Sequence, residues 1–317
     1  MKFIIYTLML FVMSYLVSSH PAMAAQKSFD YQLKPEKIAD NTYLIRGKLE
    51  DFSKKNGGNI LNTAFIVTQA GIIVIDSGPS RRYGEQQRAA ISSVSDKKII
   101  RVFNTHHHPD HFLGNQAYPR DTLYATKRTQ QALQQHAAAF TDNMYRMVGD
   151  WMRETEATIP RNTVVSSTQK FGKHTLQFLL LDGHTEADLV IFDQTTGVLF
   201  SGDLVFNQRA LSTSQANIEK WQASLKQLSQ VNYKQLVPGH GPISHDQKAI
   251  KQTSNYLNWL ITTLTASAEQ GDDMMEVMHI QIPQRFSSIA LTRYEWQRSV
   301  VHLYPKIEKS LLLPQTQ

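Results

Sequence analysis

The chain has 317 residues, of which 41% are hydrophobic and 19% are charged, a composition typical of globular proteins and not of disordered or fibrous ones. Its formal net charge is +6, but the basic residues are scattered and form no long run, so nucleic acid is not an expected partner. The chain has no cysteine, which excludes disulfides, thiolate metal ligands and a thiol nucleophile. Any bound metal ion must therefore be held by imidazole and carboxylate groups.

The N-terminus has the features of a secretory signal peptide. Lys2 supplies a positive charge, the apolar stretch 3–17 is too short for a comfortable membrane span, and Ala22-Met23-Ala24 offers small residues at a cleavage site. We therefore expect residues 1–24 to be removed, leaving a periplasmic or secreted chain, residues 25–317, with no transmembrane span. An uncleaved N-terminal anchor is the alternative.

The remaining sequence alternates between short apolar runs and longer amphipathic stretches. Short runs bounded by Gly, Asn and Pro predict strands, and helical spacing of apolar residues predicts helices. The predicted strands are residues 42–47, 60–68, 72–75, 99–103, 176–181, 189–192, 198–200 and 236–237. The predicted helices are residues 83–92 and 218–228, a helical insertion near 127–156, and a mostly helical C-terminal region over 247–312.

The order of these elements predicts a layered α/β fold, because strand, helix and strand follow one another closely. Residues 189–192 and 198–200 predict a hairpin. The helical stretch 127–156 carries a cluster of methionines and aromatics, Met144, Tyr145, Met147, Trp151 and Met152. Such a cluster is typical of a core, and the alternative is a lid or wall over a site. Since no repeat or long linker interrupts the chain, we expect one domain.

A dense group of metal-binding residue types follows the strand predicted at 99–103. In an extended segment His106 and His108 point to one side while His107 points away. The proline that follows them suits the first turn of a helix, which would bring Asp110 and His111 toward the same centre. One short segment can therefore supply four ligands.

Three more candidates, His184, Asp203 and His240, follow later apolar runs, each beside a glycine. A single histidine at a strand end is more often structural or solvated. The ordered cluster together with three further candidates is far less expected by chance. We interpret the whole set as a metal site.

These motifs resemble those of the metallo-β-lactamase-fold superfamily, over essentially the whole mature chain. The motifs are Ile75-Asp76-Ser77-Gly78, the histidine cluster 106–111, Gly183-His184-Thr185, Ser201-Gly202-Asp203 and Pro238-Gly239-His240-Gly241. The resemblance implies a four-layer αβ/βα sandwich, in which two mixed β-sheets are flanked by helices and the site lies along one sheet edge.

The resemblance also implies roles for the individual residues. One metal ion is held by His106, His108 and His184, and the other by Asp110, His111 and His240. Asp203 bridges the two ions, and Asp76 orders the ligand loops from outside. Two Zn²⁺ ions are expected, although iron or manganese suits the same donors.

Such a pair of ions lowers the pKa of water from about 15.7 toward about 7. We expect the resulting hydroxide to attack the carbonyl of an ester, thioester or amide in a small-molecule substrate, while Asp110 orients the water or moves its proton. Arg209 follows a strand end on the expected active face and is a candidate for binding a substrate carboxylate or phosphate. The alternative is an arginine on a solvated loop.

Longer strings, 75–84 and 202–209, resemble the exported quinoprotein relay system zinc metallohydrolases, which implies a functional link to a periplasmic quinoprotein dehydrogenase but names no substrate. The ligand set with Asp203 is that of thioesterases such as glyoxalase II, of lactonases and of phosphodiesterases. Four alternatives stay open: a β-lactamase proper, an iron-containing enzyme like persulfide dioxygenases, a nuclease, and a metal-binding accessory protein of a periplasmic dehydrogenase. The β-lactamase is disfavoured because its best-known subclass has a cysteine in place of Asp203.

Overall fold

The structure is a computed structural model that describes residues 29–312. The expected signal peptide, residues 1–24, lies outside the described residues, so its cleavage stays a prediction. Tyr31 begins the compact unit that carries the helices and strands described here.

Two β-sheets form the inner layers of this unit. One has seven strands in the order β1-β2-β3-β4-β5-β6-β7, and the other has five in the order β12-β11-β10-β9-β8. The strands of the first sheet are β1 (Glu36–Ala39), β2 (Thr42–Ile45), β3 (Thr63–Val67), β4 (Ile72–Ile75), β5 (Ile99–Phe103), β6 (Leu123–Ala125) and β7 (Asn162–Thr163). The strands of the second are β8 (Ser167–Phe171), β9 (His174–Leu181), β10 (Asp188–Asp193), β11 (Val198–Phe206) and β12 (Gln235–His240). Both sheets are mixed, since β4 pairs parallel with β5 but antiparallel with β3, and β11 pairs parallel with β12 but antiparallel with β10.

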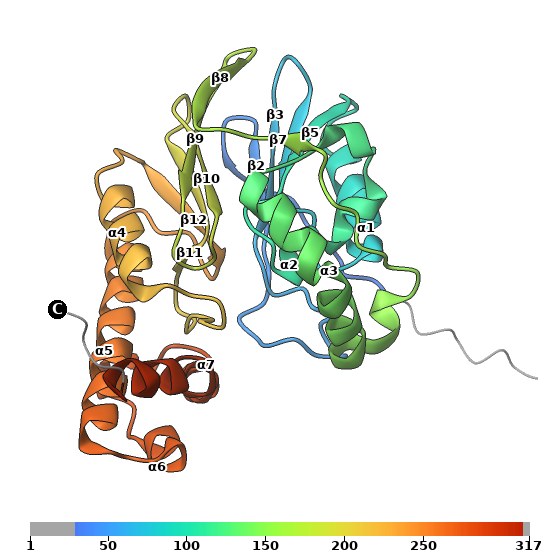
Figure 1. Cartoon of the computed structure of the whole chain (residues 1–317). Helices are drawn as coiled ribbons and strands as arrows, with labels where there is room; N and C mark the ends of the chain where they lie inside the picture. The colour runs from blue at the N-terminus through green and yellow to red at the C-terminus, as the bar shows by residue number, and fades with distance from the viewer. Residues whose placement is uncertain (1–28, 313–317) are drawn as a thin grey trace, which may run out of the picture. The chain divides into compact units, whose positions relative to one another are not determined.

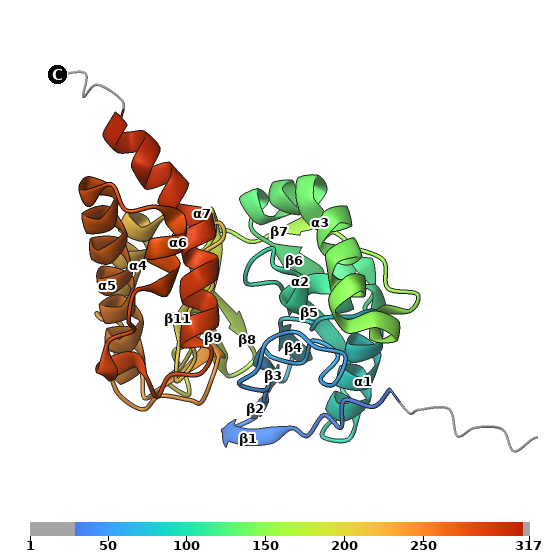
Figure 2. The same ribbon diagram turned by 90° about the horizontal axis from the view of Figure 1, so that it is seen from below.

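Helices cover the outer faces of both sheets (Figures 1 and 2). The first sheet is covered by α1 (Arg81–Ser92), and the second by α4 (Ile218–Leu228) and α5 (Lys248–Gln270). The remaining helices are α2 (Pro109–Phe112), α3 (Lys127–Val148), α6 (Met274–His279) and α7 (Thr292–Leu312), with short 3₁₀ helices at Leu113–Ala117, Arg120–Thr122, Gly149–Met152 and Gln284–Phe286. This arrangement is the αβ/βα sandwich that the resemblance to the superfamily implies.

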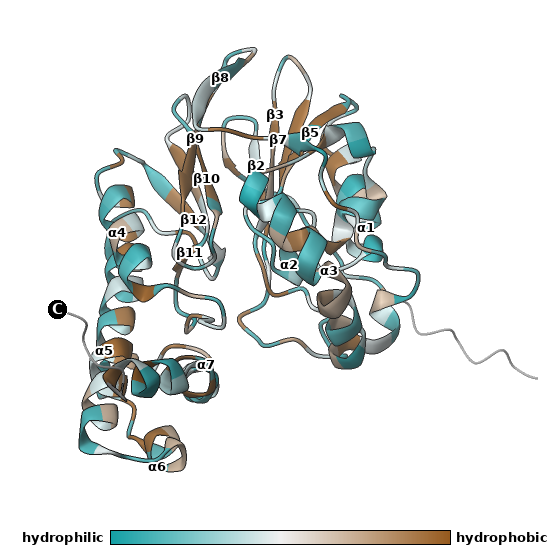
Figure 3. Ribbon diagram, viewed as in Figure 1, coloured by the Kyte–Doolittle hydropathy of each residue, from teal (hydrophilic) through white to brown (hydrophobic). Residues whose placement is uncertain are grey.

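The continuous apolar runs of the central strands explain the layering. In β4, Ile73 and Ile75 pack between the two sheets, whereas Ile72 and Val74 pack outward beside Ile91 of α1. Successive side chains of a strand point to opposite faces, so a strand covered on both faces needs apolar residues at every position. Figure 3 shows the result, with hydrophobic strands inside and hydrophilic helix surfaces outside.

The predicted elements are mostly observed, and their bounds differ where side-chain hydrogen bonds or pairing override the apolar pattern. The hairpin of β10 and β11 is confirmed by the pairing of Asp193 with Val198. Helix α1 begins two residues earlier than predicted because the Ser80 hydroxyl accepts a hydrogen bond from the Tyr83 N–H. The strand predicted at 198–200 is too short, since β11 continues to Phe206 by pairing with β12.

The helical stretch predicted at 127–156 is one long helix, α3, followed by a 3₁₀ turn. The helix stops at Val148 because Gly149 adopts a positive φ of 64°. Met144 and Met152 are fully buried in a cluster between α2 and α3. Tyr145, by contrast, is 53% exposed, so the predicted core role holds for part of the cluster only.

The region after β12 is helical, and its three helices share a small core of their own. Leu260 of α5, Val277 of α6 and Trp296 of α7 are buried together. Helix α6 begins with a reciprocal pair of hydrogen bonds between Asp273 and Glu276. Within residues 29–312 none of the helices combines the length and the apolar character needed to cross a membrane.

The packing of α3 can be tested at two neighbouring positions. Met144→Ala is expected to lower the free energy of unfolding by about 2–5 kcal/mol, because it opens a cavity in a closed cluster. Tyr145→Ala, on the exposed face of the same turn, is expected to change it by less than about 0.5 kcal/mol. Urea unfolding at one fixed zinc concentration measures both values, and equal effects would contradict the described orientation of α3.

Candidate metal centre

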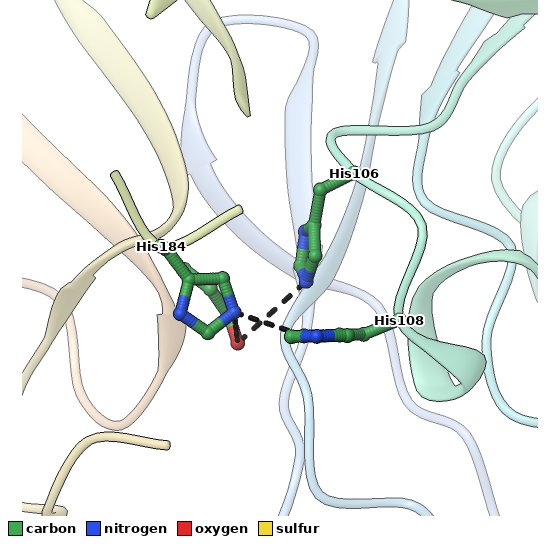
Figure 4. A group of neighbouring side chains, drawn as sticks. His106, His108 and His184 are labelled. Carbon is green, nitrogen blue, oxygen red and sulfur yellow. Dashed lines mark hydrogen bonds and ion pairs between the residues drawn. The ribbon is translucent and has the colours of Figure 1, made fainter. Parts of the chain in front are cut away.

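All seven candidate ligands of the sequence lie together where strands of the two sheets end. His106 follows β5, His184 follows β9, Asp203 lies within β11 and His240 ends β12. Figure 4 shows His106 and His108 on one loop and His184 on a distant part of the chain, with the three rings pointing toward one another. The candidate ligands therefore lie close to one another in the structure, as expected.

The ligand atoms fall into two groups. In the first, one atom from each of His106, His108, His184 and Asp203 lies within 4.8 Å of the others, and in the second the same holds for Asp110, His111 and His240. Asp203 also reaches the second group, because its Oδ1 lies 3.3 Å from His111 Nε2 and its Oδ2 lies 3.2 Å from His240 Nε2. The aspartate thus stands between the two groups.

The local sequence explains why the segment 106–111 supplies four of these side chains. Pro109 occupies the first position of α2, and His108 precedes it in an extended conformation. The turn carries Asp110 and His111 to the side that His106 and His108 face, as the sequence predicts. His107 belongs to neither group and points elsewhere, also as predicted.

Two glycines allow the close approaches that the site requires. A Cβ on Gly239 would lie 1.8 Å from Asp203 Oδ1, and a Cβ on Gly183 would lie 2.2 Å from the Trp221 backbone. Side chains at these positions would displace the carboxylate and the loop that carries His184. The glycines beside the ligands are therefore part of the site's construction.

Asp76 and Thr105 orient the ligands from outside. The Asp76 carboxylate accepts hydrogen bonds from the Thr105 N–H and hydroxyl at 2.8 and 2.9 Å, and its Oδ2 lies 2.8 Å from His111 Nδ1. The Thr105 hydroxyl is also 3.0 Å from His106 Nδ1. On the opposite side of the site, His240 Nδ1 donates to the Ile60 carbonyl at 2.8 Å. These hydrogen bonds engage Nδ1 of His106, His111 and His240, so the Nε2 atoms of these three rings face the centre.

Burial and charge set the protonation of the group. Burial holds the pKa of His106 and of His108 well below the ordinary value, and it lowers the pKa of His184 to about 3. Burial opposes charge on His111 too, but the carboxylates of Asp203, Asp110 and Asp76 outweigh it and hold its pKa well above the ordinary value. The neutral imidazoles of His106, His108 and His184 offer the lone pairs that a cation needs, whereas a cation bound by His111 must displace a proton from it.

The residues present fit a pair of divalent cations. Three buried atoms that face the centre, His106 Nε2, His111 Nε2 and Asp203 Oδ1, make no well-directed hydrogen bond within residues 29–312, although the last two lie 3.3 Å apart. Buried polar atoms left without partners are costly unless something else satisfies them. A set of imidazole nitrogens and carboxylate oxygens suits zinc, and also iron or manganese.

A cavity of about 300 Å³ opens onto the centre. His108, Asp110, Asp203 and His240 reach it. Its apolar wall includes residues from the loop between β2 and β3, from α3 and from β11, namely Phe52, Ile60, Phe140, Met147 and Phe206. Met147 thus supports the alternative role of the 127–156 stretch, as a wall over the site.

Arg209 also lines the cavity, but its side chain is only 3% exposed. Its guanidinium donates to the Ala210 carbonyl and to Glu295 of α7, at 3.0 and 3.4 Å. Arg298, also on α7, donates to the same carboxylate and is 36% exposed at the cavity. Arg209 is therefore not on a solvated loop, and whether it touches substrate stays a prediction.

Several of these residues gave no signal in the sequence. Arg298 and Tyr294 reach the cavity from α7, about ninety positions beyond Asp203. Asn62 donates to the carbonyls of Pro238 and Gly241 at 2.9 and 2.7 Å and so holds the loop that carries His240. Thr105 alone could have been found, since it directly precedes the histidine cluster.

Comparison with known families identifies the class of protein. The model that describes the Metallo-beta-lactamase superfamily matches residues 56–240, which hold all seven candidate ligands. The chain therefore belongs to the metallo-β-lactamase superfamily.

Individual relatives are more distant. The chain is 28% identical over 113 residues to a hydroxyacylglutathione hydrolase of Gloeobacter violaceus, a match that covers 34% of this chain and 36% of the relative. It is 26% identical over 141 residues to one of a Synechococcus species, covering 42% and 46%. The chain thus aligns with less than half the length of these curated relatives. A solved metallo-beta-lactamase from Pontibacter korlensis shares the fold, with a TM-score of 0.59 and 21% identity over 72% of this chain and 99% of that one.

The orienting role of Asp76 can be tested by Asp76→Asn, which fits the positive φ of 58° at this position. An amide cannot accept all three hydrogen bonds, so zinc affinity of the group with His111 is expected to fall about 10- to 100-fold. Zinc titration against a chromophoric chelator measures this loss. The exposed Asp96→Asn serves as the control, and unchanged affinity in both variants would contradict the assigned role of Asp76.

Proposed function

We propose that this chain is an exported, dinuclear zinc hydrolase that cleaves an ester, thioester or amide bond in a small anionic substrate. The observation that carries the proposal is the pair of buried ligand groups joined by Asp203 at the floor of a cavity. The five imidazoles in the set favour zinc over manganese, and iron is the alternative metal for the same donors.

When bound, the two cations supply Lewis acidity, which lowers the pKa of water and polarises the bond under attack. His106, His108 and His184 would hold one of them, and Asp110, His111 and His240 the other, with Asp203 shared. These assignments agree with the grouping of the ligand atoms.

Asp110 is the residue best placed to handle a proton. Its Oδ2 lies 3.4 Å from His240 Nε2 and 3.6 Å from His111 Nε2, and the side chain also reaches the cavity. Burial raises the pKa of Asp110, although the neighbouring histidines oppose the shift. A bound cation would lower this pKa, so it is the position of Asp110 beside the cavity and both histidines that suits it to orienting the attacking water.

A thioester is the substrate class that the relatives favour. Both curated relatives are named hydroxyacylglutathione hydrolases, although each match covers less than half of the relative. The apolar wall of the cavity excludes water from one side of the bound acyl group. If the protein hydrolyses β-lactams instead, the proposed thioester substrate is wrong.

The charges around the cavity favour an anionic substrate once cations are bound. Arg209 and Arg298 flank the buried carboxylate of Glu295, and Asp51 lines the same cavity, so these four side chains together carry no net charge. Two divalent cations would outweigh the charges of Asp110 and Asp203 and make the cavity positive. Arg298 donates to Glu295 but is 36% exposed, so its guanidinium is also accessible to a ligand carboxylate, for which bidentate pairing is the usual geometry.

Export and a link to a periplasmic quinoprotein dehydrogenase are part of the proposal. They rest on the signal-peptide features of residues 1–24 and on the resemblance of residues 75–84 and 202–209 to the quinoprotein relay metallohydrolases. Cell fractionation with an antibody against the chain tests the location directly.

The reaction class is tested with the mature chain, residues 25–317, and three substrates: a hydroxyacylglutathione, a chromogenic cephalosporin and a simple lactone. We expect hydrolysis of the thioester that stops on addition of a chelator and returns with zinc. Asp203→Ala is expected to lose this activity while its circular dichroism stays that of the parent protein. Hydrolysis that survives complete metal removal would contradict the proposal.

The anionic end of the substrate is tested by Arg298→Ala. We expect KM for the anionic thioester to rise about tenfold, which corresponds to about 1.4 kcal/mol, with kcat little changed because uniform binding is lost. An uncharged thioester of similar size should show no such rise. Lys309→Ala, on the exposed surface of the same helix, is the matched control, and an equal rise for both substrates would argue against a charge contact.

A further inference from the structure

His107 is a buried histidine that the two ligand groups do not use. Its side chain is only 3% exposed, and the rings of His136 and Phe140 on α3 lie 6.2 and 6.0 Å from it. Its Nε2 lies 2.7 Å from Oε1 of Gln215, a residue 108 positions further along the chain. The buried His107 imidazole, in the middle of the ligand segment, is thus hydrogen-bonded to an amide that is distant in the sequence.

The same amide oxygen also contacts a candidate ligand. Gln215 Oε1 lies 2.9 Å from His108 Nε2. A carbonyl oxygen can only accept hydrogen bonds, and it has two lone pairs. Both imidazoles therefore donate from Nε2, and the two donors use the full accepting capacity of the oxygen.

This contact decides which nitrogen of His108 is left for the centre. With its proton on Nε2, His108 presents an unprotonated Nδ1, and this atom lies 2.9 Å from His184 Nε2 within the first ligand group. The hydrogen bond made by one ring nitrogen sets the tautomer and the aim of the other. Asp76 acts in the same way on His111, and the Ile60 carbonyl on His240.

Gln215 differs from those partners because it belongs to the loop between β11 and α4, which also lines the substrate cavity through Ser212 and Ser214. The loop is fixed on both sides of the glutamine. The Thr213 hydroxyl donates to Ser299 of α7 at 2.7 Å, and the Asn217 N–H donates to the Gly183 carbonyl at 2.9 Å. The amide is therefore held at a defined place relative to His108.

We propose that Gln215 is a positioning residue for the first metal group: its amide oxygen selects the tautomer and the orientation of His108, and His107 holds that oxygen in place by donating the second hydrogen bond. The inference rests on the metal-binding part of the proposed function and not on its substrate. The sequence predicts only that the His107 side chain points away from the ligands, and this proposal gives that side chain a function.

Zinc binding alone tests the proposal. Zinc is titrated into metal-free protein against a chromophoric chelator, for the parent and for two variants. Gln215→Asn keeps an amide but is one methylene shorter, so affinity of the first group is expected to fall about 10- to 100-fold. Gln215→Glu keeps an acceptor of the same reach and is expected to retain parental affinity. The second group should keep its affinity in both variants.

Cobalt provides a readout that a change in stability would not imitate. The visible absorption of the Co²⁺-loaded protein reports ligand geometry, so Gln215→Asn should change it and Gln215→Glu should preserve it. Gln131→Asn is the matched control, because Gln131 is an exposed glutamine of α3 that lines the same surface pocket as His107 and Gln215. Gln215→Met, which removes the acceptor at nearly constant length, replaces Gln215→Asn if that variant does not fold.

The part assigned to His107 needs a double-mutant cycle. His107→Phe is expected to weaken zinc binding less than Gln215→Asn does, and the double variant should be no weaker than Gln215→Asn alone, because both changes act through one interaction. Additive losses would overturn the role of His107. Parental zinc affinity and cobalt absorption in Gln215→Asn would overturn the role of Gln215, whereas a parent protein that binds no zinc would overturn the proposed function itself.

Discussion

The burial of five imidazoles and two carboxylates at one edge of the sandwich is the constraint on which the rest of the structure depends. Charged and polar groups taken out of water are costly unless they are paired or bound to a cation. The fold meets this cost by placing Asp203 between the imidazoles of both groups and by giving the ligands hydrogen-bonding partners outside the centre. Gly183 and Gly239 meet the same requirement, because they let the backbone approach the ligands closely.

The ligands of the centre come from strands and loops of both sheets. His106 and His111 come from the first sheet's side, whereas Asp203 and His240 come from strands of the second. The C-terminal helices, which lie beyond the family match that ends at residue 240, complete the cavity with Arg298. The candidate metal ligands therefore lie in the part of the chain that matches the family, whereas Arg298 lies outside it.

The layered α/β class and the closeness of the candidate ligands could be predicted because those signals are local, whereas the four-layer sandwich was implied by the resemblance to a family. The apolar run of β4 and the turn at Pro109 depend on neighbours in the chain, and both are observed as expected. Gln215 and Arg298 could not be predicted, since each contacts the site only through tertiary packing across about ninety or more positions. Arg209 was placed on the correct face, but its burial against Glu295 is a long-range contact that no local pattern reports.

The central claim is that two cations lie on either side of Asp203. Anomalous diffraction at the zinc edge, from crystals of the zinc-loaded mature chain, tests it most directly. The account predicts two peaks, one bounded by His106, His108 and His184 and the other by Asp110, His111 and His240, with Asp203 contacting both. A single peak, or a pair of peaks that Asp203 does not touch, would contradict it.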